Sequence, residues 1–323
     1  MVKWLKLVKL SKFNFFSMPD RIIYWRPVLA LIFLLNSSLF AQDIEPRRWN
    51  NLPLGTQVAG LGYAYSFGDV FFDPLLQAED VDVRVHSLVA AFVHPFRIGK
   101  RPARVDLLLP FSFARWEGLL SGEPASAERN GMADPRIRLS YHITGPPPMN
   151  PKEMREYLAQ HAKYTTFGVS LAVSLPLGQY NDERLLNLGL NQFVFRPQIG
   201  LLHNWGLWSF ELTASVFLFT DNNDFFNDGN KRQDPLFAAQ AHLIKRFKSR
   251  SWVSVSTGFG QGGQSVVNRQ PNDDVRANFL ASASYGYPLG PKQSLKFTYI
   301  RSETLKDIGA DTNNLILGWT FAF

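Results

Sequence analysis

Charged and polar residues recur at every second position in several stretches of the chain, and this spacing is the first feature that could carry chemistry. Arg136 and Arg138 form one such pair, and Gln240 and His242 form another. Side chains two residues apart lie on the same face of a β-strand, so each pair would present its groups together. On the inner face of a membrane β-barrel, such groups line the lumen and select solutes by charge.

A larger set of polar residues is expected to face such a lumen. The set could form a charged rim that selects solutes, or a network of ion pairs that fills a narrow lumen, since buried charges must be paired to be tolerated. The two roles are compatible, and the structural role is favoured for any single residue. The candidates are Asp82, Arg84, His86, Asp106, Arg136, Arg138, Arg196, Glu211, Gln240, His242, Arg276, Asn278 and Lys296.

Two other arrangements suggest a ligand, and each has a simpler explanation. The Asp and Asn residues of 221–230 offer oxygen ligands for calcium, but their spacing is not that of the twelve-residue calcium loop, and such residues are ordinary in turns. The run from Gly258 to Gly263 matches the dinucleotide fingerprint formally, yet no helix follows it to bind a phosphate. We expect no metal and no cofactor, and calcium binding by 221–230 stays open.

An outer-membrane lipid hydrolase is the enzyme that has to be considered. That chemistry needs a serine nucleophile beside a histidine at the lipid-facing surface. His142 is followed by Thr144 at the matching position, and His86 and Ser87 are adjacent, so they point to opposite faces of a strand. We therefore expect no catalytic residues and no enzyme activity.

The segments that would position these residues are short, alternating stretches separated by turn residues. Between Trp208 and Leu218, large apolar residues alternate with polar ones such as Glu211. No apolar run after residue 41 is long enough for a spanning helix, so an all-β transmembrane antiparallel barrel of about twelve strands is predicted. The expected strands are 56–67, 81–95, 102–116, 132–144, 165–176, 189–203, 206–220, 233–248, 251–262, 273–288, 291–303 and 311–323.

The connections between these segments differ systematically in length. Those after even-numbered segments are mostly short, as at 203–206 and 288–291, and those after odd-numbered segments are long and polar, as at 117–131 and 221–232. Short periplasmic turns and long outer loops are the rule in outer-membrane barrels. Both ends of the barrel sequence are therefore expected on the periplasmic side.

The exception among the short turns is 145–163, between the fourth and fifth segments. Asn150 can cap a helix, Pro151 suits its first position, and Glu153 can complete the cap. This pattern predicts a short helix on the periplasmic side.

Aromatic residues mark the expected membrane interface and the end of the chain. Trp205, Trp208 and Trp252 flank the short turns, where amphipathic rings are favourable. The chain ends at Phe323, within the last alternating segment, as suits a strand that closes a barrel and leaves no edge in lipid. A terminal Phe also resembles the signature read by the barrel-assembly machinery. The expected partners are this machinery, outer-membrane lipid and a small-molecule solute.

Residues 1–41 have the layout of a secretory signal peptide. Basic residues precede a short apolar run at 28–35 that is too short to span a membrane, and small or polar residues follow up to Ala41. Cleavage is expected after Ala41, and Met18 is a possible true start. The expected division is therefore 1–41 as signal peptide, 42–55 as a periplasmic N-terminal segment and 56–323 as the barrel.

The composition excludes two other classes of protein. The formal net charge is +7, but the leader contributes +5 of it, so no basic surface remains to follow nucleic-acid phosphates. The chain has no cysteine, which excludes disulfides and thiolate sites.

Several motifs give the chain a family resemblance that covers it from about Glu45 to the end. It resembles the bacterial outer-membrane transporters named for a putative meta-pathway of phenol degradation. The resemblance implies a membrane barrel and, more loosely, uptake of aromatic compounds. The motifs are Pro176 to Tyr180, Asn187 to Asn191, Phe219 to Phe226 and Gln233 to Pro235.

We therefore expect a passive channel for small molecules, aromatic or weakly polar, in the outer membrane of a Gram-negative bacterium. A lipid hydrolase and a plugged structural or surface-binding barrel remain as alternatives. A barrel of twelve strands is too narrow for a wide aqueous pore, so its lumen could be open or plugged.

Overall fold

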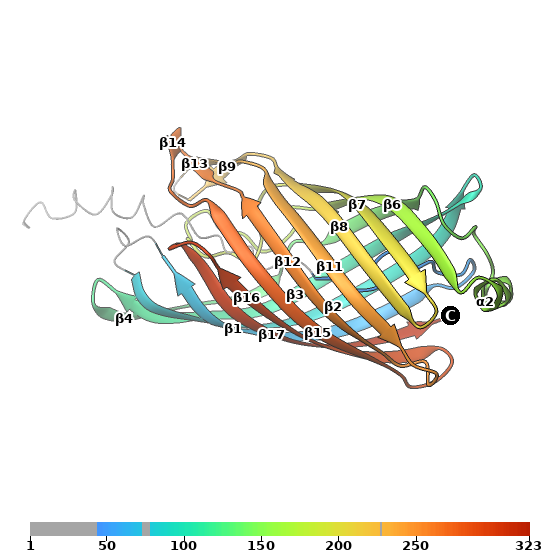
Figure 1. The fold of residues 1–323 in the computed structure, drawn as a ribbon. Coiled ribbons are helices and arrows are strands. Elements are labelled where there is room, and N and C mark those ends of the chain that lie inside the picture. The colour runs from blue at the N-terminus through green and yellow to red at the C-terminus, as the bar shows by residue number, and fades with distance from the viewer. Residues whose placement is uncertain (1–43, 73–77, 227) are drawn as a thin grey trace, which may run out of the picture.

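The structure, a computed structural model, describes residues 44–72, 78–226 and 228–323, which form a closed antiparallel β-barrel (Figure 1). Twelve strands make the wall, and β1 pairs with the last strand, β17, to close it. The expected all-β barrel is thus confirmed. The expected signal peptide, 1–41, lies outside the described residues.

Each wall strand pairs with its neighbours in the chain, and β4 and β5 together count as one wall strand. The wall strands are β1 (Val58–Phe71), β2 (Ala78–Ile98), β3 (Arg101–Leu120), β4 (Glu123–Met132), β5 (Arg136–His142), β6 (Lys163–Ser174), β7 (Val194–Trp205), β8 (Trp208–Phe219), β11 (Leu236–Arg246), β12 (Trp252–Gly262), β15 (Arg276–Pro288), β16 (Gln293–Thr304) and β17 (Gly309–Ala322).

The alternation of side chains divides the wall into a lipid face and a lumen face. In β8, Glu211 and Thr213 are buried toward the lumen, and Leu212 between them is exposed. Large apolar residues stay exposed on the outside all around the barrel; Val255, for example, is 70% exposed. An apolar surface of this extent is unfavourable in water, so this face lies in the hydrocarbon of a membrane. Within the described ranges, no helix is long and apolar enough to cross a membrane.

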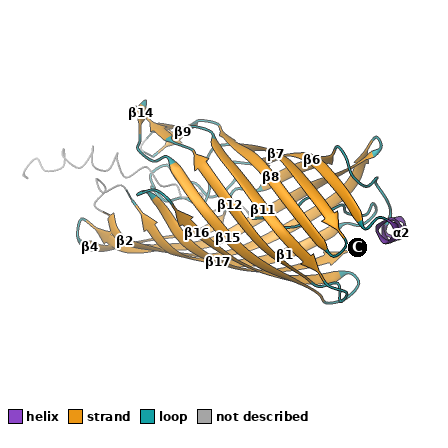
Figure 2. Ribbon diagram, in the orientation of Figure 1, coloured by secondary structure: helices purple, strands orange, loops and turns teal. Residues whose placement is uncertain are grey.

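The two ends of the barrel differ, as Figure 2 shows. One end carries the short turns, the C-terminus and α2 (Pro151–Gln160). Asn150 accepts hydrogen bonds from the backbone of Lys152 and Glu153, and Glu153 bonds back to the N–H of Asn150, which completes a capping box. The predicted helix is therefore confirmed.

The opposite end carries a second, four-stranded sheet of β9 (Asn222–Phe225), β10 (Gly229–Gln233), β13 (Ser265–Val267) and β14 (Gln270–Pro271). The sequence predicted loops here, and also at 117–131, where β3 continues and β4 begins. These strands escaped prediction because the end of the β3–β4 hairpin, residues 120–126, is exposed on both faces and the strands of the outer sheet are short. Neither carries the apolar alternation that marks a membrane strand.

The wall is interrupted between β4 and β5. Residues 111–120 of β3 pair with β4, and residues 103–108 pair with β5. Three residues, 133–135, therefore stand opposite Leu109 and Pro110. Pro135 has no N–H to donate to a ladder. Asp134 instead accepts hydrogen bonds from the N–H groups of Gly178 and Leu190 at 2.9 and 2.8 Å. The loop 175–193 is thereby tied to the interruption.

The same loop carries apolar side chains into the outer half of the lumen. Leu186 and Leu188 pack against a cluster that includes Val83 and Trp116 on β2 and β3. Leu190 packs against a second cluster on the other side, around Leu236 of β11. Apolar side chains of 175–193 therefore pack against two opposite sides of the outer lumen.

Candidate functional site

The chain that precedes β1 lies inside the barrel. Ile44 packs against Leu280 and Ile300 of β15 and β16, whereas Glu45 contacts Arg138 of β5. In the strand order, β5 and β15 stand on opposite sides of the wall, so these two neighbouring residues reach across the lumen. Residues 44–50, called the plug here, therefore cross the middle of the barrel. The sequence analysis expected 42–55 as a periplasmic segment, and the structure places residues 44–50 of it inside the barrel.

Glu45 is the plug's main anchor to the wall. Its carboxylate accepts two hydrogen bonds from the Arg138 guanidinium, one of them at 2.9 Å, and a third from Arg136 at 3.3 Å. Its backbone N–H donates to Oε1 of Gln240 on β11 at 3.1 Å. A carboxylate held in this bidentate way by arginine is among the stronger charge-assisted pairs in proteins.

Arg48 anchors the plug's other end. Its guanidinium pairs with Asp106 at 3.1 Å and donates to the Ser140 hydroxyl, and its backbone N–H donates to Glu211 at 3.1 Å. The Arg48 side chain is almost fully buried. Glu45 and Arg48 carry opposite charges, and with Arg47 the plug brings a formal charge of +1 into the lumen.

Trp49 fills a recess in the wall that is formed by β6, β7 and β8. Its side chain is fully buried and its indole N–H donates to Thr213 at 2.8 Å. Two inward-facing glycines, Gly168 and Gly200, make room for the ring. A Cβ at Gly200 would lie 1.9 Å from the ring, and one at Gly168 would lie 2.7 Å from it. The recess therefore exists only because both positions lack a side chain.

Six of the residues that the sequence assigned to a lumen gather around the plug. Asp106, Arg136, Arg138, Glu211 and Gln240 contact it directly, and Arg196 donates to Ser215 at 3.3 Å with its guanidinium over the Phe217 ring. The barrel thus brings together side chains from five separate strands.

The other inward-facing candidates lie elsewhere in the lumen. His242 of β11 is buried across from Glu211, and Lys296 of β16 is opposite Gly318 of β17. Arg276 and Asn278 are at the outer end of β15. There, burial lowers the pKa of nearby Lys231 in the outer sheet to about 8, with Arg276 acting in the same direction and Asp274 against it.

Three candidates have the wrong orientation. Asp82, Arg84 and His86 lie on the outer face of β2, because the alternating Val83 and Val85 are buried in the lumen. Placing these three residues in the lumen implied that Val83 and Val85 face lipid. In this part of β2 the valines face the outer lumen instead, so the inward-facing and outward-facing positions are exchanged relative to the expectation.

Trp252 also points the other way from the interfacial girdle in which the sequence placed it. It is buried in the lumen against Gly286, and the Arg47 guanidinium lies 5.1 Å from its ring centre. Trp208 and Trp319 do face outward, where both are more than a third exposed.

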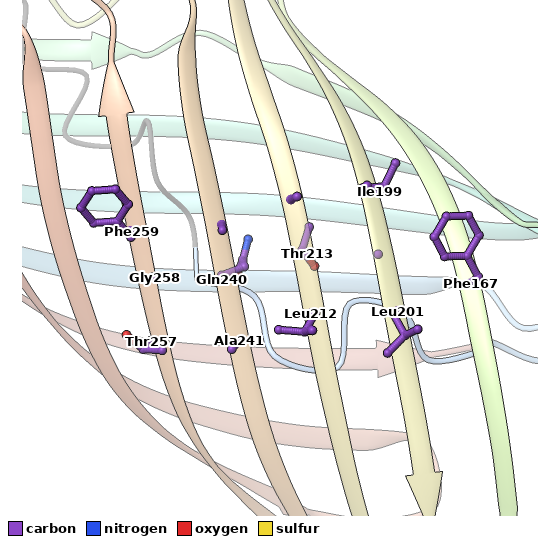
Figure 3. Close-up of a pocket in the computed structure, with 13 residues that line it drawn as sticks. Phe167, Ile199, Leu201, Leu212, Thr213, Gln240, Ala241, Thr257, Gly258 and Phe259 are labelled. Carbon is purple, nitrogen blue, oxygen red and sulfur yellow. The ribbon is translucent and has the colours of Figure 1, made fainter.

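The wall also has a hollow of about 430 Å³ on its lipid-facing side, shown in Figure 3. Small residues, Ala214, Ala239 and Ala241, form its floor, and Phe167 and Phe259 stand at its edges. Because its lining is almost wholly apolar and faces the bilayer, lipid can fill it. The polar chemistry of the protein is on the other side of the same strands.

The described ranges contain no group of three or more acidic or histidine side chains that could hold a metal ion. His142, which the sequence considered for hydrolase chemistry, is buried toward the lumen and bonds to the Asn51 side chain. It therefore helps to hold the chain between the plug and β1.

The sequence analysis missed the plug residues themselves. Glu45, Arg48 and Trp49 lie outside any alternating segment, so no strand pattern marks them. The available signal is composition, because Glu45 to Trp49 combines three charges and a tryptophan immediately before the first strand. Charges and a large ring in a segment of this kind indicate a docked element.

A sequence profile of the family described as "Putative MetA-pathway of phenol degradation" matches residues 74–309. No curated protein matches the chain significantly. Among solved structures, the COG4313 outer membrane channel from Pseudomonas putida F1 overlaps with a TM-score of 0.73 at 18% identity, over 87% of this chain and 100% of that one.

Two further solved structures overlap more loosely. The transport unit of the autotransporter AIDA-I from Escherichia coli gives a TM-score of 0.49 at 8% identity, over 93% of this chain and 97% of that one. The CymD monoaromatic hydrocarbon channel gives 0.44 at 9% identity, over 84% and 89%.

Proposed function

Since the chain belongs to the family described as "Putative MetA-pathway of phenol degradation" and folds as an outer-membrane β-barrel, we propose that it is a passive channel for small aromatic or weakly polar molecules. The observation that carries this proposal is the plug. Residues 44–50 fill the lumen, yet they are attached to the wall through side chains and not through a strand ladder. Such an element can leave without disrupting the barrel.

The plug's attachment supports this reversibility. The first backbone-to-backbone bond from this region to another part of the protein is from Leu54 to Met149, beyond the plug. The plug is held by the ion pairs of Glu45 and Arg48, by their two backbone N–H bonds to wall side chains, and by the packing of Ile44, Arg47 and Trp49. A closed state held by a few polar contacts can be in equilibrium with an open one, and a solute that binds only the open state shifts that equilibrium.

The lining supports small and weakly polar solutes. The outer lumen is apolar, with Val83, Trp116 and Leu236 in its clusters, and the charged cluster around Arg138 follows further in. A molecule that passes must be compatible with both surfaces. Simple sugars and large ions fit the apolar part poorly.

The test is solute flux into liposomes that contain the purified protein. We expect faster uptake of benzyl alcohol than by protein-free liposomes, because the alcohol also crosses bare bilayers, and little uptake of a larger disaccharide. Benzyl alcohol uptake equal to that of protein-free liposomes, together with a silent planar bilayer, would exclude the channel.

A plugged barrel with a structural role is the second candidate, and the filled lumen favours it. The channel and the structural barrel differ in what happens to the plug, because a structural barrel keeps its plug in place. Release of the plug under any condition that also produces flux would decide for the channel.

We also propose that the C-terminal strand addresses the chain to the barrel-assembly machinery. Phe323 ends β17's extension and exchanges two backbone hydrogen bonds with Gln57, at 2.8 and 2.9 Å. The same residue thus takes part in closing the barrel seam.

A further inference from the structure

The arginine site around Glu45 has the geometry of a carboxylate-binding site. Arg138 presents two N–H groups to one carboxylate, and Arg136 adds a third. Planar, bidentate recognition of this kind is specific for carboxylate and phosphate groups. The present occupant, however, belongs to the plug and not to the barrel wall.

The recess that holds Trp49 has the shape of an aromatic ring, and it opens at Gly168, four residues along β6 from the position opposite Arg138. Gly168 and Gly200 leave space that only a flat group fills, and Thr213 offers its hydroxyl oxygen at the edge. The indole of Trp49 occupies this space in the closed state. The plug therefore presents one carboxylate and one aromatic ring, each to a built site on the lumen wall.

We propose that the plug is an internal substitute for solute, and that the sites of Glu45 and Trp49 bind small aromatic carboxylates when the plug leaves. This inference rests on the proposed function and names the class of molecule that it prefers. An aromatic acid carries both of the groups that the plug now supplies. Its binding and that of the plug exclude each other.

The charges around the site favour an acid over other aromatic compounds. Arg136 and Arg138 hold Glu45 directly, and Arg104 pairs with Asp106 nearby at 3.2 Å. An organic cation would meet these guanidinium groups with repulsion. A neutral aromatic molecule can use the recess but cannot accept the charge-assisted hydrogen bonds that the two arginines give to Glu45.

The test is calorimetric binding of 3-phenylpropionate and of its uncharged analogue 3-phenylpropanol to the purified barrel in detergent. Glu45→Gln removes the competing charge and keeps the side-chain shape, so we expect the acid to bind about tenfold more tightly, as the loss of a charge-assisted hydrogen bond would allow. The alcohol should change much less. Adding Arg138→Gln should abolish the gain for the acid. Glu128→Gln, on the exposed outer hairpin, is the matched control.

Thiol labelling is a second measurement, for the case that the variants used for calorimetry fold poorly. The chain has no cysteine, so Thr213→Cys introduces one thiol beneath Trp49. In the Glu45→Gln background, where the plug leaves more often and uncovers this thiol, we expect the acid to slow its labelling by a maleimide, because the ring of the bound acid takes the place of Trp49. The alcohol should slow it weakly. Equal effects of the acid and the alcohol on both binding and labelling would overturn the carboxylate site, as would an acid that binds Glu45→Gln no better than the unaltered protein.

Failure of this inference and failure of the channel are distinguishable. Flux of uncharged benzyl alcohol tests the channel without reference to the arginines. Flux of benzyl alcohol without acid binding would leave the channel and remove the carboxylate site. Acid binding without any flux would support the carboxylate site and exclude the channel.

Discussion

The Oε1 atom of Glu45 lies 2.9 Å from Nη2 of Arg138, and the two residues are 93 positions apart in the chain. Glu45 belongs to the plug and Arg138 to the barrel wall, so this pair attaches the plug to β5. The pair can be separated without unpairing any strand. If the plug leaves as proposed, the strength of this pair sets how often the lumen is open.

Glu45→Ala should increase the conductance of the protein in planar bilayers. The substitution removes three hydrogen bonds to arginine, and a hydrogen bond to a charged group contributes about 1.5–3 kcal/mol. Each 1.4 kcal/mol shifts an equilibrium about tenfold, so the open fraction should increase by at least about tenfold. Conductance equal to that of Glu128→Ala would contradict the role of the pair.

Gly200→Ala should release Trp49 from its recess. The added Cβ would lie 1.9 Å from the ring, which no small adjustment relieves. We expect faster maleimide labelling at Thr213→Cys in this background and a change in tryptophan fluorescence. Gly62→Ala is the matched control, because its Cβ would have no neighbour closer than 3.8 Å. The hypothesis fails if the two alanine variants label at the same rate.

Asp134→Ala should loosen the loop 175–193. Its carboxylate accepts the N–H groups of Gly178 and Leu190, and each bond to a charged acceptor contributes about 1.5 kcal/mol or more. The measurement is trypsin cleavage after Arg184 in the folded barrel, which should become several-fold faster. Asp307→Ala, in an exposed outer turn, should leave the rate unchanged. An unaltered rate in Asp134→Ala would show that apolar packing alone holds the loop.

Deletion of Phe323 should lower the yield of assembled barrel. The residue exchanges two backbone hydrogen bonds with Gln57 at the closing seam, and each contributes about 1 kcal/mol. Folded barrel is measured by heat-dependent mobility on gels of outer-membrane fractions. Phe323→Tyr keeps the ring and the backbone and should assemble normally. Full assembly of the deleted chain would refute both the seam contribution and the targeting role.

The sequence by itself determined the barrel, because alternation is a local property. Glu211 and Leu212 have opposite environments for the simple reason that adjacent residues of a strand face opposite sides. The helix at Pro151–Gln160 was also predictable, since Asn150 and Glu153 form its cap within one turn. The twelve segments and their turn lengths followed from the same kind of short-range pattern.

Only the tertiary structure decided which face of β2 meets the lumen and what fills the barrel. Val83 faces inward because the outer lumen is apolar, and that depends on Leu186 from a loop about a hundred positions away. The carboxylate of Glu45 meets Arg138 because closing the wall brings five strands around the plug. Such contacts join residues distant in sequence, and no periodic pattern encodes them. The sequence shows that the charge of Glu45 and the ring of Trp49 need partners if they are buried. Only the folded barrel shows which residues those partners are.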